Sequence, residues 1–338
     1  MENQRWLWPC IITALVIISL LSVSIGPLHI SPSTSFNAMI NWATQQSLSV
    51  VAPHEQLVIN NVRLPRTLLA LTVGATLAQC GAVMQGLFRN PLADPGIIGV
   101  SSGAALGAAL CIVLFPQGGE YLVAFSAFGA GLLTTLLVYK LASSVSGTSV
   151  VLLLLSGVAV AALAGAGIGL LTYMASDMAL RDLTLWKMGS IAGAQWHYVI
   201  LSLIALALLS WQFTQNANAL NALLLGEAEA RHLGVNVDKL KRKLIVLCAI
   251  GVGIAVAATG IIGFIGLVVP HLIRMLIGPD HKLLLPLSAM LGAAILMLAD
   301  IGARSIVAPS ELPVGLVTAL LGAPFFIVLL LNQRNKLV

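Results

Sequence analysis

The sequence has little charge and few catalytic signatures. Only 9% of its 338 residues are charged, whereas soluble domains carry about 25%, so an ordinary water-soluble enzyme is excluded. The chain lacks the phosphate-binding pattern GxxxxGK[ST] and the HExxH and GxSxG patterns of hydrolases. We therefore expect no catalytic residues and no nucleotide bound by a phosphate loop.

Metal ligands and ionisable clusters are also scarce. The four cysteines lie far apart, each within an apolar run, and no pair has the spacing of a zinc or redox site. The apolar segments contain no group of acids like the proton relays of ion-coupled transporters, and no charged ring like a channel filter. The sequence therefore predicts no metal site and no energy source for transport within the chain itself.

Apolar residues dominate what is present. They make up 59% of the chain, and a helix needs about 20 of them to cross the hydrocarbon core of a bilayer. We predict an all-α polytopic membrane protein in which residues 1–338 form one transmembrane domain of about ten helices in the lipid bilayer. The expected spans are roughly residues 7–25, 68–87, 99–115, 124–141, 150–175, 198–213, 244–262, 264–277, 285–303 and 313–331.

The basic residues predict the orientation in the membrane. Placing the N-terminus inside and alternating the spans puts 12 of the 17 Lys and Arg residues, Arg5 and Lys336 among them, on the cytoplasmic side. Because positive charge concentrates on that side, both termini are expected to be cytoplasmic. The net charge of +5 is then a matter of topology and not of nucleic-acid binding. The basic residues left outside are Arg63, Arg66, Arg181, Lys187 and Arg304.

Polar segments separate some of the spans. Residues 26–62 form a long outer loop and residues 214–243 a long inner loop. Ser176–Gln195 mixes charged and apolar residues and predicts a short amphipathic helix at the outer interface.

Two inner segments carry turn and helix signals. Gly99, Gly103 and Gly107 follow a proline-rich turn and recur every four residues, which predicts a face for close helix contact. Gly226–Gly234 predicts a short charged helix with acids in its first turn and a glycine at its end. This helix is either a solvated linker or a surface on which a cytoplasmic engine acts.

The arginines near the outer side have two interpretations. Arg63 and Arg66 flank a proline directly before the second span, and they either anchor the helix in lipid headgroups or dock an acidic partner. For Arg304, docking competes with a local ion pair to Asp300, four residues earlier.

Two histidines raise the question of haem or metal ligation. His271 follows a proline inside an apolar span, and His281 lies near the inner surface. We interpret both as hydrogen-bonding structural residues rather than as ligands.

With these motifs the sequence resembles the permease subunits of bacterial ABC importers for iron–siderophore complexes, haem and cobalamin, the FecCD-type permeases. The matches run in order from about residue 60 to 326, whereas the first 55 residues carry little of the resemblance. The matching motifs are Arg63–Arg66 (RLPR), Gln85–Pro95 (QGLFRNPLADP), Gly99–Gly103 (GVSSG), Gly226–Gly234 (GEAEARHLG), Gly263–Arg274 (GFIGLVVPHLIR), Ala299–Arg304 (ADIGAR), Glu311–Gly315 (ELPVG) and Gly322–Pro324 (GAP).

The resemblance implies an assembly in the bacterial inner membrane. Two copies of the chain, each with two inverted halves, would form a homodimer above two copies of a cytoplasmic ABC ATPase, and a periplasmic substrate-binding protein would deliver substrate from outside. ATP and magnesium would be used by the ATPase, with no cofactor bound by this chain.

The resemblance also implies residue roles. Arg63 and Arg304 match binding-protein docking positions, and the fifth span with Ser176–Gln195 matches the helices that line the outer pathway. The residues matching the ATPase coupling contact are Gly226, Glu227, Ala230, Arg231, Leu233 and Gly234, and those matching the cytoplasmic gates are Asn90, Leu92, Thr148 and Ser149.

The substrate is expected to be haem. The sequences NPLADP and GVSSGA most resemble those of the haem branch of the family. An apolar pathway with Met174, Met178 and Met188 would also suit a porphyrin. An iron–siderophore complex and cobalamin are the alternatives for the same machinery. The rival class is a stand-alone secondary transporter.

Overall fold

The computed structural model describes residues 7–26, 28, 30–45, 51–144 and 147–334 of the chain. Arg5 and Lys336, two charges of the predicted cytoplasmic belt, lie outside these residues. The elements are α1 (Leu7–Ser24), α2 (Pro32–Thr44), α3 (Pro53–Val58), η2 (Ile59–Arg63), α4 (Leu64–Leu87), η3 (Pro95–Ile98), α5 (Val100–Leu114), α6 (Gly119–Ala142), β1 (Ser143–Ser144), β2 (Gly147–Thr148), α7 (Val150–Met174), α8 (Asp177–Met188), α9 (Trp196–Gln215), α10 (Ala217–Leu224), α11 (Glu227–His232), α12 (Val237–Thr259), α13 (Ile265–Ile277), α14 (His281–Ser305) and α15 (Val314–Arg334).

All ten predicted apolar segments are helical, and they correspond to α1, α4, α5, α6, α7, α9, α12, α13, α14 and α15. Within the described ranges, six helices are long and apolar enough to cross a membrane: α4 with its preceding turns, α6, α7, α9, α12 and α14. In the other four, the apolar stretches found within the described residues are 10–17 positions long, although α1 and α15 themselves have 18 and 21 residues. The structure is therefore a mainly helical multi-pass protein, and a count of ten spans requires the shorter helices to cross as well.

The helix that contains the seventh predicted span begins two helical turns before residue 244, where that span was predicted to start. α12 begins at Val237, where Asn236 Oδ1 accepts the backbone amide of Lys239 at 3.0 Å and caps the helix. Hydropathy overlooks these first turns because Asp238 and several lysines belong to them.

The predicted outer loop, residues 26–62, is largely helical. α2 begins after Ser31, whose side chain accepts the amide of Thr34 at 3.1 Å, with Pro32 in the first turn. α3 likewise begins at a proline, Pro53, and passes through a π-helical turn directly into α4. Neither helix contains a long apolar run, so hydropathy does not predict them.

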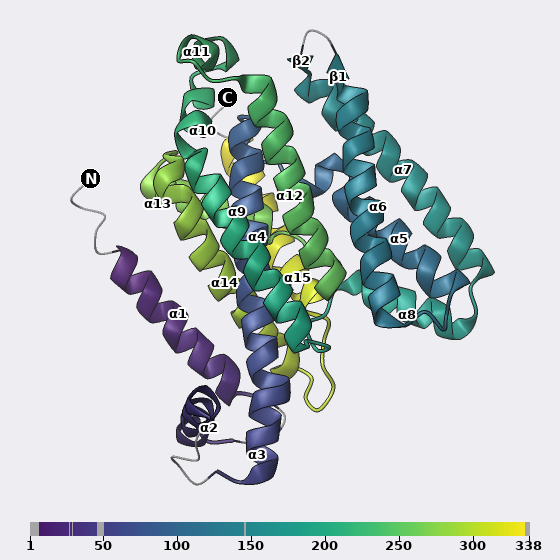
Figure 1. Ribbon diagram of the computed structural model, residues 1–338, viewed down its shortest axis with the longest axis vertical. Coiled ribbons are helices and arrows are strands. Elements are labelled where there is room, and N and C mark those ends of the chain that lie inside the picture. The colour runs from purple at the N-terminus through teal and green to yellow at the C-terminus, as the bar shows by residue number, and fades with distance from the viewer. Residues whose placement is uncertain (1–6, 27, 29, 46–50, 145–146, 335–338) are drawn as a thin grey trace.

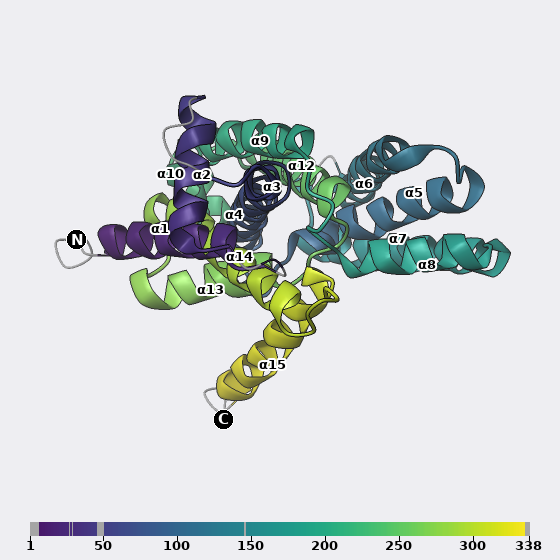
Figure 2. The same ribbon diagram turned by 90° about the horizontal axis from the view of Figure 1, so that it is seen from below.

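The core of the fold surrounds α4. In its most apolar window 89% of the residues are buried, against 22% in α7. α4 contacts α9, α12, α13 and α14, whereas α5, α6, α7 and α8 form a group on one side of it (Figure 1). Seen along the bundle, α15 projects away from the other helices (Figure 2). The apolar sides of α7 and α15 are therefore left largely uncovered by the chain itself.

Glycines set the closest helix crossings. A Cβ added to Gly81 of α4 would lie 1.8 Å from the carbonyl oxygen of Gly266 in α13. A Cβ on Gly103 or Gly107 of α5 would lie 2.3 Å from an atom of α6. The predicted small-residue face of α5 is thus confirmed as a contact face, because side chains larger than hydrogen would push the backbones apart.

The shorter elements gather at the two ends of the bundle. α10, α11 and the β1–β2 hairpin lie at one end, and α2, α3 and α8 lie at the other (Figure 1). The hairpin pairs Ser143 with Thr148 and is antiparallel, a small exception to the all-α prediction. We call these the α11 end and the α8 end; the distribution of basic residues predicts them to be cytoplasmic and outer, respectively.

Candidate coupling and gating sites

The short helix α11 confirms the predicted charged helix at Gly226–Gly234. The glycines that flank it adopt positive φ, 123° at Gly226 and 83° at Gly234, conformations in which other residues are strained. Ala230 is fully buried, whereas Leu233 is 63% exposed. One face of α11 therefore packs on the chain while the other, with Leu233 beside it, is open for a partner.

Ion pairs tie α11 to the start of α12. Glu227 Oε1 lies 2.6 Å from Lys241 Nζ. Arg231 Nη2 lies 3.9 Å from Glu227 Oε2 and 3.6 Å from Asp238 Oδ2. The Lys241 side chain is only 2% exposed, and its Nζ also donates a 3.2 Å hydrogen bond to the backbone oxygen of Thr148. α11, α12 and the hairpin are thus joined at a single ammonium group.

The predicted gate residues Thr148 and Ser149 lie where the hairpin enters α7. Thr148 Oγ1 lies 3.1 Å from Ser143 Oγ and donates to Tyr139 Oη at 3.4 Å. Ser149 Oγ accepts the backbone amide of Leu152 at 3.4 Å and caps α7. Both side chains hold the hairpin against the ends of its flanking helices.

The other predicted gate residues, Asn90 and Leu92, lie in the turn after α4. Asn90 Oδ1 accepts the backbone amide of Leu92 at 2.9 Å, which fixes the turn. The neighbouring Arg89 places Nη1 3.7 Å from the position of a Cβ on Gly226. A Cβ on Gly147 would lie 3.9 Å from Arg231 Nη2. The structure therefore brings both predicted gate segments next to the predicted coupling segment.

A buried charge cluster lies toward the α8 end. Arg66 donates from Nε and Nη2 to both oxygens of Asp300, at 2.8–3.1 Å, and from Nη1 to Glu311 at 2.7 Å. Arg304 Nη2 lies 3.2 Å from Asp300 Oδ2, so the local Asp300–Arg304 pair is confirmed. The same nitrogen donates to Ser22 Oγ at 2.8 Å. These contacts join α1, α4 and α14.

Arg63 is buried as well. Its guanidinium donates to the backbone oxygens of Val23 and Ser24 at the end of α1 and of Leu28 in the segment that follows. Arg63 is 3% exposed and Arg304 2% exposed. Docking of a partner by Arg63 and Arg304 remains a prediction, and from this conformation it would require both guanidiniums to leave their partners within the chain.

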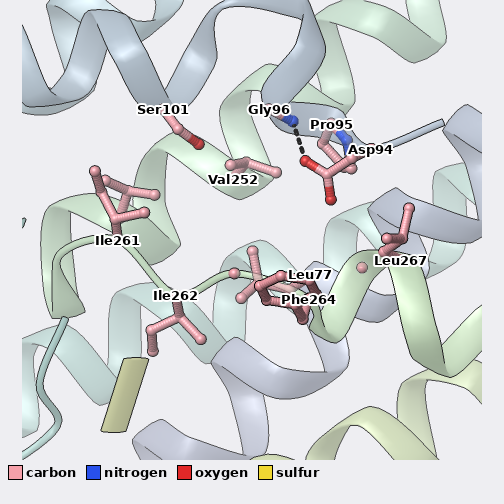
Figure 3. Close-up of a pocket in the computed structure, with 13 residues that line it drawn as sticks. Leu77, Asp94, Pro95, Gly96, Ser101, Val252, Ile261, Ile262, Phe264 and Leu267 are labelled. Atoms are coloured by element: carbon pink, nitrogen blue, oxygen red, sulfur yellow. Dashed lines mark hydrogen bonds between the residues drawn. The ribbon is translucent and has the colours of Figure 1, made fainter. Parts of the chain in front are cut away.

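A pocket of about 310 Å³ lies between α4, α5, α12 and the turn that precedes α13 (Figure 3). Asp94 is the one ionisable residue among those that line it. Asp94 Oδ1 accepts the backbone amide of Gly96 at 2.7 Å, and Figure 3 shows the other oxygen turned away from Gly96. Burial raises the pKa of Asp94, and the hydrogen bond from Gly96 opposes this only in part. No role was predicted for Asp94 itself, although it belongs to the matching motif Gln85–Pro95.

A second pocket of about 690 Å³ lies beside α8, toward the other end of the bundle. α8 is helical as predicted, with Ala179 and Leu183 buried and Met178 76% exposed. Met178 and Asp182 line the pocket together with Glu120 of α6. The pocket thus presents apolar, sulfur-containing and acidic groups on one surface.

The structure supports the interpretation of His281 as a hydrogen-bonding structural residue. His281 is fully buried, and its Nδ1 lies 2.9 Å from Asn221 Oδ1, which also accepts its backbone amide at 2.8 Å. His281 Nε2 faces Gly86, where an added Cβ would lie 2.3 Å from it. In the described part of the chain, no three His, Cys, Asp or Glu residues come close enough together to hold a metal ion.

Comparison with known proteins gives consistent matches. The profile of the FecCD transport family matches residues 14–332. The chain is 46% identical over 326 residues to a hemin transport system permease protein, HmuU, of Yersinia pestis, covering 95% of this chain and 94% of that protein. It is 38% identical to a vitamin B12 import system permease protein, BtuC, of Vibrio cholerae, covering 99% and 97%.

A solved structure also has this fold. It is described as an inward-facing conformation of a metal-chelate type ABC transporter. It superposes with a TM-score of 0.83 at 37% identity and covers 95% of this chain and 97% of that one.

The fold and these relatives define a permease subunit of an ABC importer, a multi-pass protein of the inner membrane whose ATP is hydrolysed by a separate subunit. The chain belongs to the FecCD transport family, as its motifs predict. A permease of this kind works with an ATPase and a substrate-binding protein.

Proposed function

We propose that the chain forms the membrane pathway of an ATP-driven haem importer, which moves haem from a periplasmic binding protein to the cytoplasm by alternating access. The observation that carries this proposal is the 46% identity to a hemin permease along almost the full length of both chains. The pocket beside α8, with Met178 on its wall, offers the apolar and polarisable surroundings that suit a porphyrin.

The functional unit is a homodimer with both termini in the cytoplasm. α7 exposes large apolar side chains along its length, with Val158 at 67%, Leu163 at 71% and Tyr173 at 89% exposure. On α15, Leu320 and Leu321 are 64% and 66% exposed. A second copy of the chain would cover part of these faces and place the pathway between the two subunits, while lipid would cover the rest.

α11 is the surface on which the ATPase acts, and the two segments beside it are the gates. Arg231 of α11 and Leu233 directly after this helix are exposed. The turn at Asn90–Leu92 and the hairpin residues Thr148 and Ser149 lie next to α11. Closure of the ATPase on ATP and magnesium would move α11, and the motion would reach both gates directly. This chain itself would hold no cofactor.

The α8 end is where the binding protein docks. The Arg63 and Arg304 positions belong to this end, and Glu311 of the same cluster is 28% exposed in its side chain. We expect these arginines to meet acidic residues of the two lobes of the binding protein when the outward-open state rearranges the cluster.

Cobalamin and iron–siderophore complexes are the alternative substrates of the same machinery. The 38% identity to a vitamin B12 permease over 99% of the chain is the observation that favours cobalamin. A secondary transporter without an ATPase is disfavoured by the family membership.

The test is uptake by vesicles that contain the permease and its ATPase. Haem, a ferric siderophore and cobalamin are compared, each with its matched binding protein, with and without ATP. Haem uptake that requires ATP hydrolysis is the expected result. ATP-dependent uptake of only another substrate would refute the haem assignment, and uptake without ATP hydrolysis would refute the importer mechanism.

A further inference from the structure

We propose that Lys241 is a positioning residue that locks α11 and the β1–β2 hairpin into one mechanical unit. A displacement of α11 would then move Thr148 by the same amount. This inference rests on the proposed roles of α11 in coupling and of the hairpin in gating, and it adds the link between them.

The link is a single side chain with acceptors on both sides. Lys241 Nζ donates to Glu227 Oε1 of α11 at 2.6 Å and to the backbone oxygen of Thr148 at 3.2 Å. α12 carries Lys241 between the two segments, and it contacts both α11 and the hairpin strand β2 (Figure 1). A change in the position of either segment would stretch one of the two bonds.

Burying the Lys241 ammonium costs free energy, and stability alone does not account for that cost. The Lys241 side chain is 2% exposed, while Lys239 and Lys243 on the same helix are exposed to solvent. An ammonium taken out of water must be fully paired, and replacing a buried ion pair with an apolar side chain of similar size is often neutral or stabilising. Stability alone therefore gives little reason to bury Lys241, whereas a fixed geometry between two moving segments does.

A second contact runs parallel to the first. Asp238, one turn before Lys241, pairs with Arg231 of α11 at 3.6 Å. A Cβ on Gly147 of the hairpin would lie 3.0 Å from Asp238 Oδ1, so the hairpin backbone rests against the same carboxylate. Two charged residues of α12 thus touch α11 on one side and the hairpin on the other.

The test compares Lys241→Met with Lys243→Met in the permease–ATPase complex in vesicles, with the haem-loaded binding protein as the probe. Met keeps the length of the side chain and removes the ammonium, and Lys243 supplies a matched, exposed position. We expect Lys241→Met to retain the co-purified ATPase and its ATP hydrolysis within about twofold. The haem imported per ATP hydrolysed should fall about tenfold or more, in line with the loss of a charged hydrogen bond. Lys243→Met should behave as the unsubstituted chain.

Swapping the two charges distinguishes a bridge that includes Thr148 from an ion pair between Glu227 and Lys241 alone. In Glu227→Lys with Lys241→Glu the ion pair returns, but a carboxylate cannot donate to the Thr148 carbonyl. The swap should therefore stay uncoupled. Recovery of the uptake ratio in the swap would overturn the bridge, and so would an unchanged ratio in Lys241→Met. If Lys241→Met does not assemble, Lys241→Gln carries the same test, because its amide is polar but uncharged and the side chain is one atom shorter than that of lysine.

A distance measurement makes the test independent of the substrate. Spin labels at His232→Cys and Val151→Cys, with Cys10 replaced by Ser, report on α11 and on the segment after the hairpin; both labelled positions are exposed. The inter-label distance should be the same with and without trapped ATP in the otherwise unsubstituted chain, and should change or broaden in Lys241→Met. Equal distance changes in both would refute the rigid unit even if haem proves to be the wrong substrate.

Discussion

Replacing Asp300 with Asn tests whether the buried charge cluster holds α1, α4 and α14 together. Asp300 is fully buried and is the carboxylate shared by Arg66 and Arg304. Asn keeps the shape of the side chain and one oxygen acceptor, but it removes the negative charge. Two buried guanidiniums then remain, of which Arg66 keeps Glu311 and Arg304 keeps Ser22.

The expected loss follows from the burial of both partners. Removing one member of a buried ion pair costs about 3–5 kcal/mol, because the charge left behind stays out of water without compensation. With an unfolding entropy of about 2.1 cal/mol/K per residue, a chain of 338 residues would lose about 4–7 °C in Tm. The loss would be larger in a membrane protein whose helices persist after unfolding, since the unfolding entropy is then smaller.

Thermal unfolding of the purified permease in detergent measures this loss, with Glu311→Gln as the control. Glu311 makes one bond of 2.7 Å to Arg66, but its side chain is 28% exposed. Solvent screens such a pair, so we expect a cost of no more than about 1 kcal/mol and a Tm change below about 2 °C. Equal shifts in the two variants, or no shift in Asp300→Asn, would refute the argument that burial gives this cluster its strength.

Three further outcomes are expected. Gly81→Ala should abolish stable folded protein, measured by size-exclusion yield, whereas Gly129→Ala should not, because a Cβ clashes at 1.8 Å at the first position and meets no atom within 4 Å at the second. The raised pKa of Asp94 means that folding favours the protonated form of this residue. Its contribution to stability should therefore be present below the ordinary Asp pKa and be lost as the pH rises through the raised pKa. Asp94→Asn should remove that part of the pH dependence of Tm, and an identical dependence of Tm on pH in the two proteins would contradict this reasoning. Arg231→Glu should change Tm little, since its side chain is 51% exposed, yet it should lower uptake per ATP; unchanged coupling would remove Arg231 from the ATPase contact.

The sequence predicted the helices well because a continuous apolar run is a local property. Each of the ten apolar segments is a helix, and the charged helix at Gly226–Gly234 and the amphipathic helix within Ser176–Gln195 are both present. The helical segments that were not predicted lie in polar sequence, namely the first two turns of α12 and the helices α2 and α3. Because α12 begins at Val237, Lys241 lies on the apolar face of this helix. The burial of Lys241 can be predicted from the sequence only when the helix is known to start there.

The sequence alone determined that the chain is a membrane protein, where its apolar helices lie and which family it belongs to, because hydropathy and the order of the motifs are properties of the linear sequence. Only the tertiary structure decided which charges are buried and with whom. Arg66 meets Asp300 across 234 positions, and Lys241 meets Thr148 across 93. Such pairs depend on how helices cross, and crossings are set by side-chain volume at points such as Gly81 and Gly266 that no periodicity reveals.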